Sequence, residues 1–249
     1  MRRTPATALV LALLTLAPAG RAAASPAVQA AVEHGLRGER KIALTFDACT
    51  TRAPSPYDPA ITAVLEAMHV PATIFVGGGW AREEPAALAE LARDPLLEIG
   101  NHTETHPHLT RLPDARIREE LLAAQRDIAA VTGRAPTLFR PPYGEYDARV
   151  LRVAAELGLT TVEYDLPSGD PDPRASTPAL IRWVLREARP GSIIVMHINH
   201  PRFHTAEALP AIVAGLRARG FELVTVGELL RERERGAAPT AATATATAT

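Results

Sequence analysis

KIALTFDAC, residues 41–49, is a run of apolar and β-branched residues that ends in an acid and a cysteine. The run is too short for a typical helix and rich in residues that strands favour, so Lys41–Phe46 is predicted to be a strand with Asp47 at its carboxyl end. Six further runs of the same kind follow along the chain: Ala72–Val76, Leu97–Gly100, Thr137–Phe139, Leu159–Tyr164, Ser192–Met196 and Glu222–Val226.

Helical patterns lie between most of these predicted strands. Asp58 and Thr177 each precede a proline, and a capping side chain before a proline at the first helical position is a common helix start. Asp114 begins a segment whose apolar residues recur at helical spacing, and Gly133 is predicted to end it. The segment Glu145–Leu157 has the same layout.

The alternation of strands and helices predicts an α/β fold with a parallel sheet and helices outside it. About seven strands favour a distorted or incomplete (β/α) barrel, and an open doubly wound sheet is the alternative. Such an open sheet often carries a glycine-rich phosphate-binding turn. Gly77–Gly79 lacks the spacing of that turn and is predicted to be a flexible strand-to-helix loop.

The two ends of the chain differ in composition from the rest. Arg2 and Arg3 precede the apolar stretch Ala6–Ala17, and the small residues Ala22–Ala24 follow. This order is typical of a signal peptide covering residues 1–24. An uncleaved anchor is the alternative, and it is disfavoured because the apolar stretch is too short to span a bilayer. The protein is therefore predicted to be exported, to the periplasm or beyond, with no stable membrane span after processing.

Between the ends, residues 25–38 are predicted to be a polar lead-in and residues 39–235 a single domain. The Ala/Thr tail, residues 236–249, cannot build a core and is predicted to be disordered. A net charge of -1 gives no indication of nucleic-acid binding. Aromatic residues are only 4% of the chain, so a sugar-binding groove would depend on a few rings such as Trp80, Tyr143, Tyr164 and Phe203.

Reactive side chains follow the predicted strands repeatedly. They are Asp47, Asn101 and His102, Arg140, Asp165 and Asp170, and His197. Parallel strands of a barrel end on the same face, and barrel enzymes carry their active sites on that face. These residues are therefore expected to gather at one site.

The segment after the third predicted strand contains two histidines four residues apart, His102 and His106. On one helical turn they would face the same side and could bind one metal ion. Pro107 disfavours helix at His106, so the turn is expected to stop there and form a loop site.

Three other segments have the residue types of acyl-transfer chemistry. Asp47 could be a general base, a helix cap or the partner of a cation. Arg140 begins a rigid segment in which Pro141 precedes a second proline, and the Tyr143 N–H could point at a developing oxyanion. His197 is a structural histidine or, beside a metal and Asp47, a general acid.

Together these segments resemble the motifs of the polysaccharide deacetylase family, also called the NodB-homology or carbohydrate esterase family 4 fold. The resemblance covers roughly residues 41–230. The matching segments occur in the family's order: Thr45–Asp47, His102–Pro107, Arg140–Gly144, a degenerate Val162–Pro171, and Ile194–His197.

The resemblance implies a hydrolase that removes acetyl groups from N- or O-acetylated sugars. Asp47 would be the catalytic base and His197 the acid, with Arg140 holding the base and Asp170 as the partner of Arg140. His102 and His106 would bind a divalent metal, usually zinc. Tyr143 would stabilise the oxyanion, and Pro141 and Val195 would lie at the substrate. The expected partner is an acetylated polysaccharide such as peptidoglycan, a chitin-like chain or an exopolysaccharide.

The sequence departs from the family pattern at Ala48, where the family has a second aspartate that completes the metal site. A catalytic zinc usually has three protein ligands. Cys49 is a soft candidate one residue out of register, and His200 or His204 are the others; Cys49, the only cysteine, could equally be a buried thiol. The alternatives to an active deacetylase are a non-catalytic glycan-binding protein with a degenerate metal site and a metal-independent hydrolase.

Overall fold

A sheet of eight parallel strands forms the centre of the protein, in a computed structural model that describes residues 30–51 and 55–237. The strand order is β5-β4-β3-β2-β1-β7-β6, and β8 pairs with the start of β1. The strands are β1 (Lys41–Ala48), β2 (Ala72–Val76), β3 (Leu97–Asn101), β4 (Leu138–Phe139), β5 (Thr160–Thr161), β6 (Leu166–Pro167), β7 (Ile193–His197) and β8 (Glu222–Leu223).

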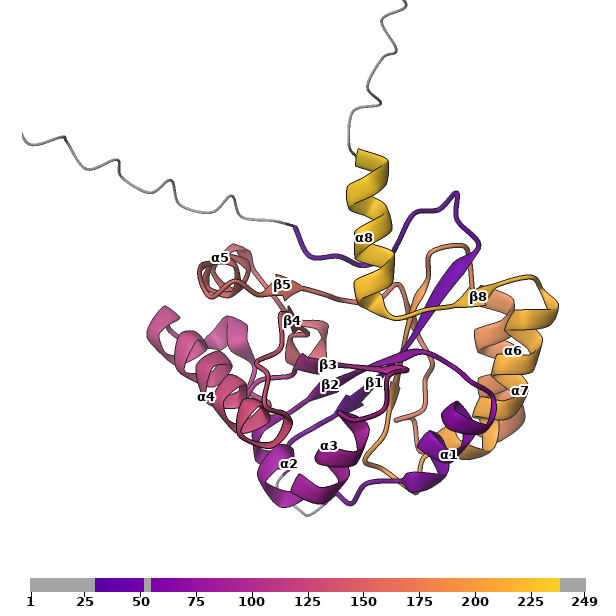
Figure 1. Ribbon diagram of the computed structural model, residues 1–249, viewed down its shortest axis with the longest axis horizontal. Coiled ribbons are helices and arrows are strands. Elements are labelled where there is room, and N and C mark those ends of the chain that lie inside the picture. The colour runs from indigo at the N-terminus through magenta and orange to yellow at the C-terminus, as the bar shows by residue number, and fades with distance from the viewer. Residues whose placement is uncertain (1–29, 52–54, 238–249) are drawn as a thin grey trace, which may run out of the picture.

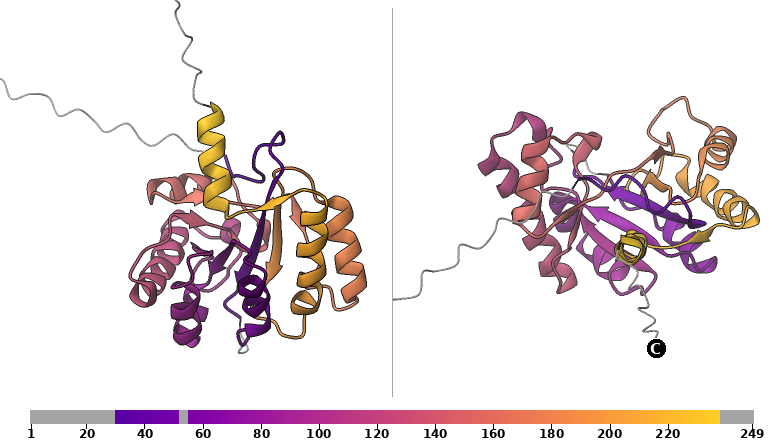
Figure 2. Two further views of the ribbon diagram at one scale, coloured as in Figure 1. Left: turned by 45° about the vertical axis from the view of Figure 1, so that its right-hand side comes forward. Right: turned by 90° about the horizontal axis from the view of Figure 1, so that it is seen from above.

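Helices surround this sheet, as Figure 1 shows, and α8 stands apart at the end where β1 begins. The α-helices are α1 (Pro59–Ala67), α2 (Gly78–Glu83), α3 (Pro85–Leu91), α4 (Asp114–Thr132), α5 (Ala148–Glu156), α6 (Thr177–Glu187), α7 (Thr205–Ala218) and α8 (Val226–Ala237), with short 3₁₀ turns η1 (Leu109–Arg111) and η2 (Pro142–Gly144). The curved sheet with its outer helices, seen from two further sides in Figure 2, is a distorted, incomplete (β/α) barrel, which confirms the predicted fold class.

The sequence predicted about seven strands, and β6 is the additional one. It has two residues and includes Pro167, which cannot donate a hydrogen bond to a ladder. Proline is tolerated there because β6 lies at the edge of the sheet, paired only with β7. So short a segment has no detectable hydrophobic pattern, which is why the prediction missed it.

The side chains of β1 alternate between the two faces of the sheet. Ile42, Leu44, Phe46 and Ala48 belong to the large apolar cluster beneath the outer helices. Ala43 belongs to a smaller cluster on the inner face. That inner cluster includes residues from the start of α8 and from the N-terminal segment, so both contribute to the core on the inner side of the barrel.

Local signals explain most helix ends. Asp58 caps α1, its Oδ1 accepting a hydrogen bond from Ala60 N at 3.1 Å, and Gly133 ends α4 with a φ of 75°. Two expectations are wrong: that Thr177 caps a helix, and that Gly77–Gly79 is a flexible loop. The residue before α6 is Ser176, and Thr177 is the first helical residue. Gly78 and Gly79 lie in α2, where an added Cβ on Gly78 would come 2.9 Å from Ala124 Cα, so close packing explains the glycine.

The predicted domain boundaries lie partly within the described residues. The predicted signal peptide, residues 1–24, lies outside them, as does the tail from residue 238. Val32 pairs with Val162 and is buried, so part of the predicted lead-in contributes to the core. Helix α8 continues to Ala237, two residues beyond the expected end of the domain. Within the described residues, no helix combines the length and the apolar character that crossing a membrane requires.

Candidate active site

A cleft of about 1190 Å³ lies at the carboxyl ends of the strands. Asp47 and His197 occupy paired positions on the neighbouring strands β1 and β7, so both side chains reach it from its floor. The lining also includes Cys49, His102, His106, His108, Arg111, Pro141, Tyr143, Tyr164, Asp170, Val195, His200 and Phe203. The structure therefore brings almost all of the predicted site residues together; Arg140 lies beneath them.

Asp47 is held by a buried arginine. The Arg140 guanidinium donates to Asp47 Oδ1 at 2.9 Å, to Thr45 Oγ1 at 2.8 Å and to the carbonyl of Glu163 at 3.3 Å. Arg140 is completely buried, and its guanidinium lies 4.1 Å from the centre of the Phe75 ring. This arrangement leaves the second oxygen of Asp47 facing the cleft, 3.7 Å from His102 Nε2.

His197 is held by a second buried carboxylate. Asp170 accepts from His197 Nδ1 at 3.0 Å and from the His197 backbone N–H at 2.7 Å. The hydroxyls of Ser168 and Thr205 also donate to Asp170, at 2.9 and 2.8 Å. The expected pairing of Asp170 with Arg140 is therefore wrong. The physical reason is position: Asp170 follows the edge strand β6, next to β7 rather than β4.

The two spaced histidines lie in a loop and not on a helical turn. His106 and Thr103 have φ values of 58° and 65°, which interrupt any helix between β3 and η1. Asn101 and Glu120 fix the loop by accepting from the backbone N–H groups of Thr103 and Thr105. The prediction of a loop was right, and the prediction of one helical turn was wrong. The backbone conformation of the loop, and not helical spacing, brings the ring centroids of His102 and His106 to 4.9 Å from each other.

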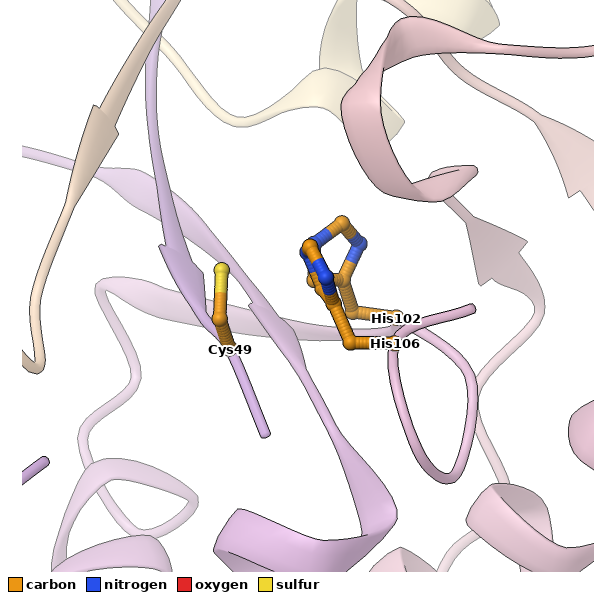
Figure 3. Close-up of side chains that lie close together, drawn as sticks. All are labelled: Cys49, His102 and His106. Atoms are coloured by element: carbon orange, nitrogen blue, oxygen red, sulfur yellow. The ribbon is translucent and has the colours of Figure 1, made fainter. Parts of the chain in front are cut away.

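Cys49 completes a cluster with these histidines. One ligand atom of each of Cys49, His102 and His106 lies within 4.8 Å of the other two, and Figure 3 shows the thiol and both rings facing one another. His102 Nδ1 is bonded to the carbonyl of Arg140 at 2.8 Å, which leaves Nε2 with a free lone pair. Two imidazoles and a thiolate are a suitable donor set for a divalent metal ion with an open position.

The other two candidate ligands lie away from this cluster. His200 Nδ1 is bonded to Ser55 Oγ at 2.9 Å, and the His200 ring packs 4.5 Å from the ring of Phe203. His204 Nδ1 lies 3.2 Å from Thr177 Oγ1. Of the three candidate third ligands that the sequence left open, Cys49 is the one that lies with His102 and His106 in the described part of the chain.

Tyr143 forms the rim of the cleft. It has a φ of 63° and is 53% exposed, its ring stacks on His108 at 4.1 Å, and its hydroxyl donates to the His106 carbonyl. Pro141 and Val195 line the cleft below it. Of the rings considered for sugar contact, Tyr143, Tyr164 and Phe203 line the cleft, whereas Trp80 is completely buried in the outer core.

Comparison with known proteins shows the family to which the chain is related. Residues 34–162 match the family model described as polysaccharide deacetylase. The chain belongs to the polysaccharide deacetylase family. It is 32% identical over 206 residues to a chitooligosaccharide deacetylase of Bradyrhizobium sp. (strain ANU 289), covering 77% of this chain and 91% of that relative. It is 31% identical over 199 residues to a peptidoglycan-N-acetylglucosamine deacetylase of Bacillus cereus, covering 78% and 89%.

The chain is also similar to solved structures. A Bacillus anthracis protein described as a pseudoenzyme of carbohydrate esterase family 4 superposes with a TM-score of 0.74 at 28% identity, covering 83% of this chain and 70% of that one. The predicted class, a carbohydrate esterase that acts on acetylated sugars, is confirmed at the level of the family.

The two titratable groups at the floor of the cleft have pKa values shifted in opposite directions. Burial alone would raise the pKa of Asp47, but the Arg140 guanidinium and the His102 and His197 imidazoles lower it below its usual range. Burial alone would lower the pKa of His197, but its hydrogen bond with Asp170 and the nearby Cys49 thiol raise it well above its usual range. Carboxylate and imidazolium are therefore the favoured forms at neutral pH.

Glu163 is a buried acid of this deacetylase that the sequence reasoning missed. Its Oε1 atom has no hydrogen-bond partner among the described residues, and its backbone carbonyl accepts from Arg140. Burial raises the pKa of Glu163 to about 7, against the opposing attraction of Arg140. The available signal was a charged residue inside an otherwise uncharged predicted strand, Leu159–Tyr164.

Glu163→Gln is expected to stabilise the deacetylase at pH 8 by about 1–3 kcal/mol and to have little effect at pH 4.5. The pKa is about 7 in the folded protein and 4.5 for the ordinary group, so the folded state binds more protons between these values. Stability contributed by Glu163 therefore falls as pH rises from about 4.5 to about 7 and stays low above it. Glutamine remains neutral and removes this cost.

The measurement is thermal unfolding of the wild type and the variant between pH 4.5 and pH 8. Glu83→Gln is the matched control, because Glu83 is an exposed acid at the end of α2. The two pH profiles of wild type and Glu163→Gln should converge at the acidic end. Parallel profiles would contradict the raised pKa of Glu163.

Proposed function

We propose that this protein is an exported deacetylase that removes acetyl groups from the N- or O-acetylated sugars of a polysaccharide, with Asp47 as general base and His197 as general acid. One observation carries the proposal. The two side chains are adjacent in register, and each is fixed by its own buried charged partner. Groups whose environments move their pKa values apart are the expected acid and base of a hydrolase.

The roles follow from the atoms that remain free. Arg140 occupies one oxygen of Asp47, so the other oxygen takes the proton of the attacking water. Asp170 occupies Nδ1 of His197, so Nε2 donates the proton to the departing amine or alkoxide. Both groups line the same cleft, which allows one bound acetyl group to contact both.

The remaining lining residues would position the acetyl group. The Tyr143 N–H would stabilise the oxyanion of the tetrahedral intermediate. Pro141 and Val195 would contact the acetyl methyl from the apolar side of the cleft. Deacetylases of this family depend on a metal ion, and here His102 and His106 would hold it. A bound divalent ion such as zinc would polarise the carbonyl and lower the pKa of a water molecule.

The substrate class rests on the relatives. The curated relatives are described as chitooligosaccharide and peptidoglycan deacetylases, so an acetylated amino-sugar chain is the proposed substrate. The signal-like residues 1–24 support export to the periplasm or the medium, where such polymers occur. An acetylated exopolysaccharide would fit the same chemistry.

Acetate release from acetylated chitooligosaccharides or peptidoglycan is expected to stop after chelation and to return when zinc is added. The reason is that the carbonyl and the water both lose their activation without the ion. The measurement is metal content of the purified protein together with acetate release before and after chelation. His106→Ala should lose the metal, whereas the matched variant His108→Ala should keep it, because His108 is bonded to Glu145 instead.

The alternative of a non-catalytic glycan-binding protein predicts a different result. Such a protein would bind the oligosaccharides and release no acetate with or without zinc. Acetate release that persists after complete chelation would instead indicate a metal-independent hydrolase. Either result would overturn the proposed mechanism.

A further inference from the structure

The alternation of β1 decides which residue faces the two histidines. Phe46 and Ala48 point into the outer apolar cluster, and Ala48 is completely buried there. Asp47 and Cys49 point into the cleft on the opposite face. Because side chains along a strand change face at every residue, position 48 faces away from the histidines in this protein and position 49 faces toward them.

A buried asparagine holds the backbone of Cys49 in this position. The ladder between β1 and β7 ends with Asp47 and His197. Beyond that pair, the Asn199 side chain donates to the Cys49 carbonyl at 2.8 Å and accepts from the Cys49 N–H at 3.3 Å. Asn199 thus continues the pairing for one more residue with its amide group. Cys49, the residue that follows β1, is therefore held through both of its backbone polar groups.

The surroundings of the thiol match a metal site better than those of an ordinary buried cysteine. Cys49 lines the cleft, is 7% exposed, and has the ligand atoms of two histidines within 4.8 Å. His102 has its second ring nitrogen committed to the Arg140 carbonyl, as metal-binding histidines commonly do. The chain contains no second cysteine, so no disulfide within the chain competes for this thiol.

We propose that Cys49 is the third protein ligand of the metal in this deacetylase, in place of a carboxylate at position 48, and that its thiolate makes the site selective for zinc and other thiophilic ions. Thiolate ligands favour such ions, whereas carboxylate ligands suit harder ions such as Mn²⁺ and Mg²⁺. The inference rests on the proposed function for the position of the metal, and it adds the ligand and the metal class.

Cobalt(II) substitution tests the ligand without measuring activity. Cobalt bound to a thiolate absorbs in the near ultraviolet through charge transfer from sulfur, and cobalt bound only by imidazole and carboxylate lacks this band. The wild-type protein, loaded with cobalt, is expected to show the band. Cys49→Ser and Cys49→Asp should lack it, and the control variant His200→Ala, which changes an imidazole outside the cluster, should keep it.

Metal affinity tests the selectivity. Zinc binding should weaken by about a hundredfold or more in Cys49→Ala, because one of three protein ligands is lost. Cys49→Asp should still bind one divalent ion, but its preference for zinc over manganese should fall by at least about tenfold. Competition with a chelator of known affinity measures both quantities. Thermal unfolding of each metal-free variant checks that the fold is retained.

Two results would overturn the inference. One is a wild-type cobalt protein with one equivalent of bound cobalt and no sulfur charge-transfer band. The other is alkylation of Cys49 at the same rate with and without zinc, together with an acetylated Cys49 detected by mass spectrometry. That outcome would make Cys49 a nucleophile assisted by His197 and Asp170.

These readouts also separate this inference from the proposed function. If no acetate is released but the cobalt band is present, the ligand assignment stands and the proposed activity fails. If acetate release depends on zinc but the band is absent, the activity stands and the role of Cys49 fails.

Discussion

Asp47→Asn is expected to lower kcat on an N-acetylated oligosaccharide by about a thousandfold. Asparagine keeps the shape of the side chain and its contact with Arg140, but it cannot accept the proton of the attacking water. The loss should be similar with an activated ester such as p-nitrophenyl acetate, because attack by water is required for both substrates. The measurement is steady-state kinetics on the two substrates.

The same substitution also removes the partner of a buried charge. Arg140 is completely buried and paired with Asp47, so Asp47→Asn is expected to lower the melting temperature as well. Kinetics are therefore measured well below the melting temperature of the variant. Asp172→Asn makes the same chemical change on a carboxylate that is paired with the exposed Arg174, and it should leave both stability and kcat unchanged. Asp47→Asn retaining a tenth or more of wild-type activity would contradict the role of base.

The fold was predictable where hydrophobic pattern and turn chemistry agree. The β1 run and the capped helices α1 and α4 follow directly from residue types. The short strand β6 and the start of α2 were not predictable. In β6 only two residues pair, and in α2 tertiary packing against Ala124 overrides the low helix propensity of glycine.

The site was predictable as a set of residues at strand ends, and less so as a set of contacts. Asp47, His102, Arg140 and His197 gather because parallel strands share one carboxyl edge. Cys49 joins the histidine cluster because the alternation of β1 continues to it. The backbone of Cys49 is held there by Asn199, which lies 150 residues away in the chain. No local pattern encodes a contact of this range.

The partner of each charged residue depends in the same way on strand order. Nothing in the sequence indicates that β6 lies beside β7, so the sequence could not assign Asp170 to His197 rather than to Arg140. Glu163 was overlooked for the related reason that its burial comes from the packing around Arg140 rather than from its own strand pattern. Strand order decides the partner of Asp170, and packing decides the burial of Glu163; both are tertiary properties.

His197→Ala is expected to lower kcat/KM on an N-acetylated oligosaccharide by about a thousandfold, but to lower it by less than about tenfold on p-nitrophenyl acetate. An amine or a sugar alkoxide is a poor leaving group and must be protonated as it departs. Nitrophenolate departs without a proton. The ratio of the two effects therefore distinguishes a general acid from a residue that only maintains the structure, because a structural defect would lower both rates together.

Asp170→Asn should give a weaker form of the same pattern. Asp170 is a positioning residue, because it contacts His197 Nδ1 and leaves Nε2 to face the substrate. Asparagine can still accept from the His197 backbone N–H, but it no longer stabilises the imidazolium. The rate on the oligosaccharide should fall by about tenfold to a hundredfold, with p-nitrophenyl acetate hydrolysis almost unchanged.

The control is Asp172→Asn, two residues further along the chain, where the carboxylate is paired with Arg174. It should change neither rate. Equal losses on both substrates in Asp170→Asn would show that Asp170 supports the cleft as a whole rather than the proton on His197.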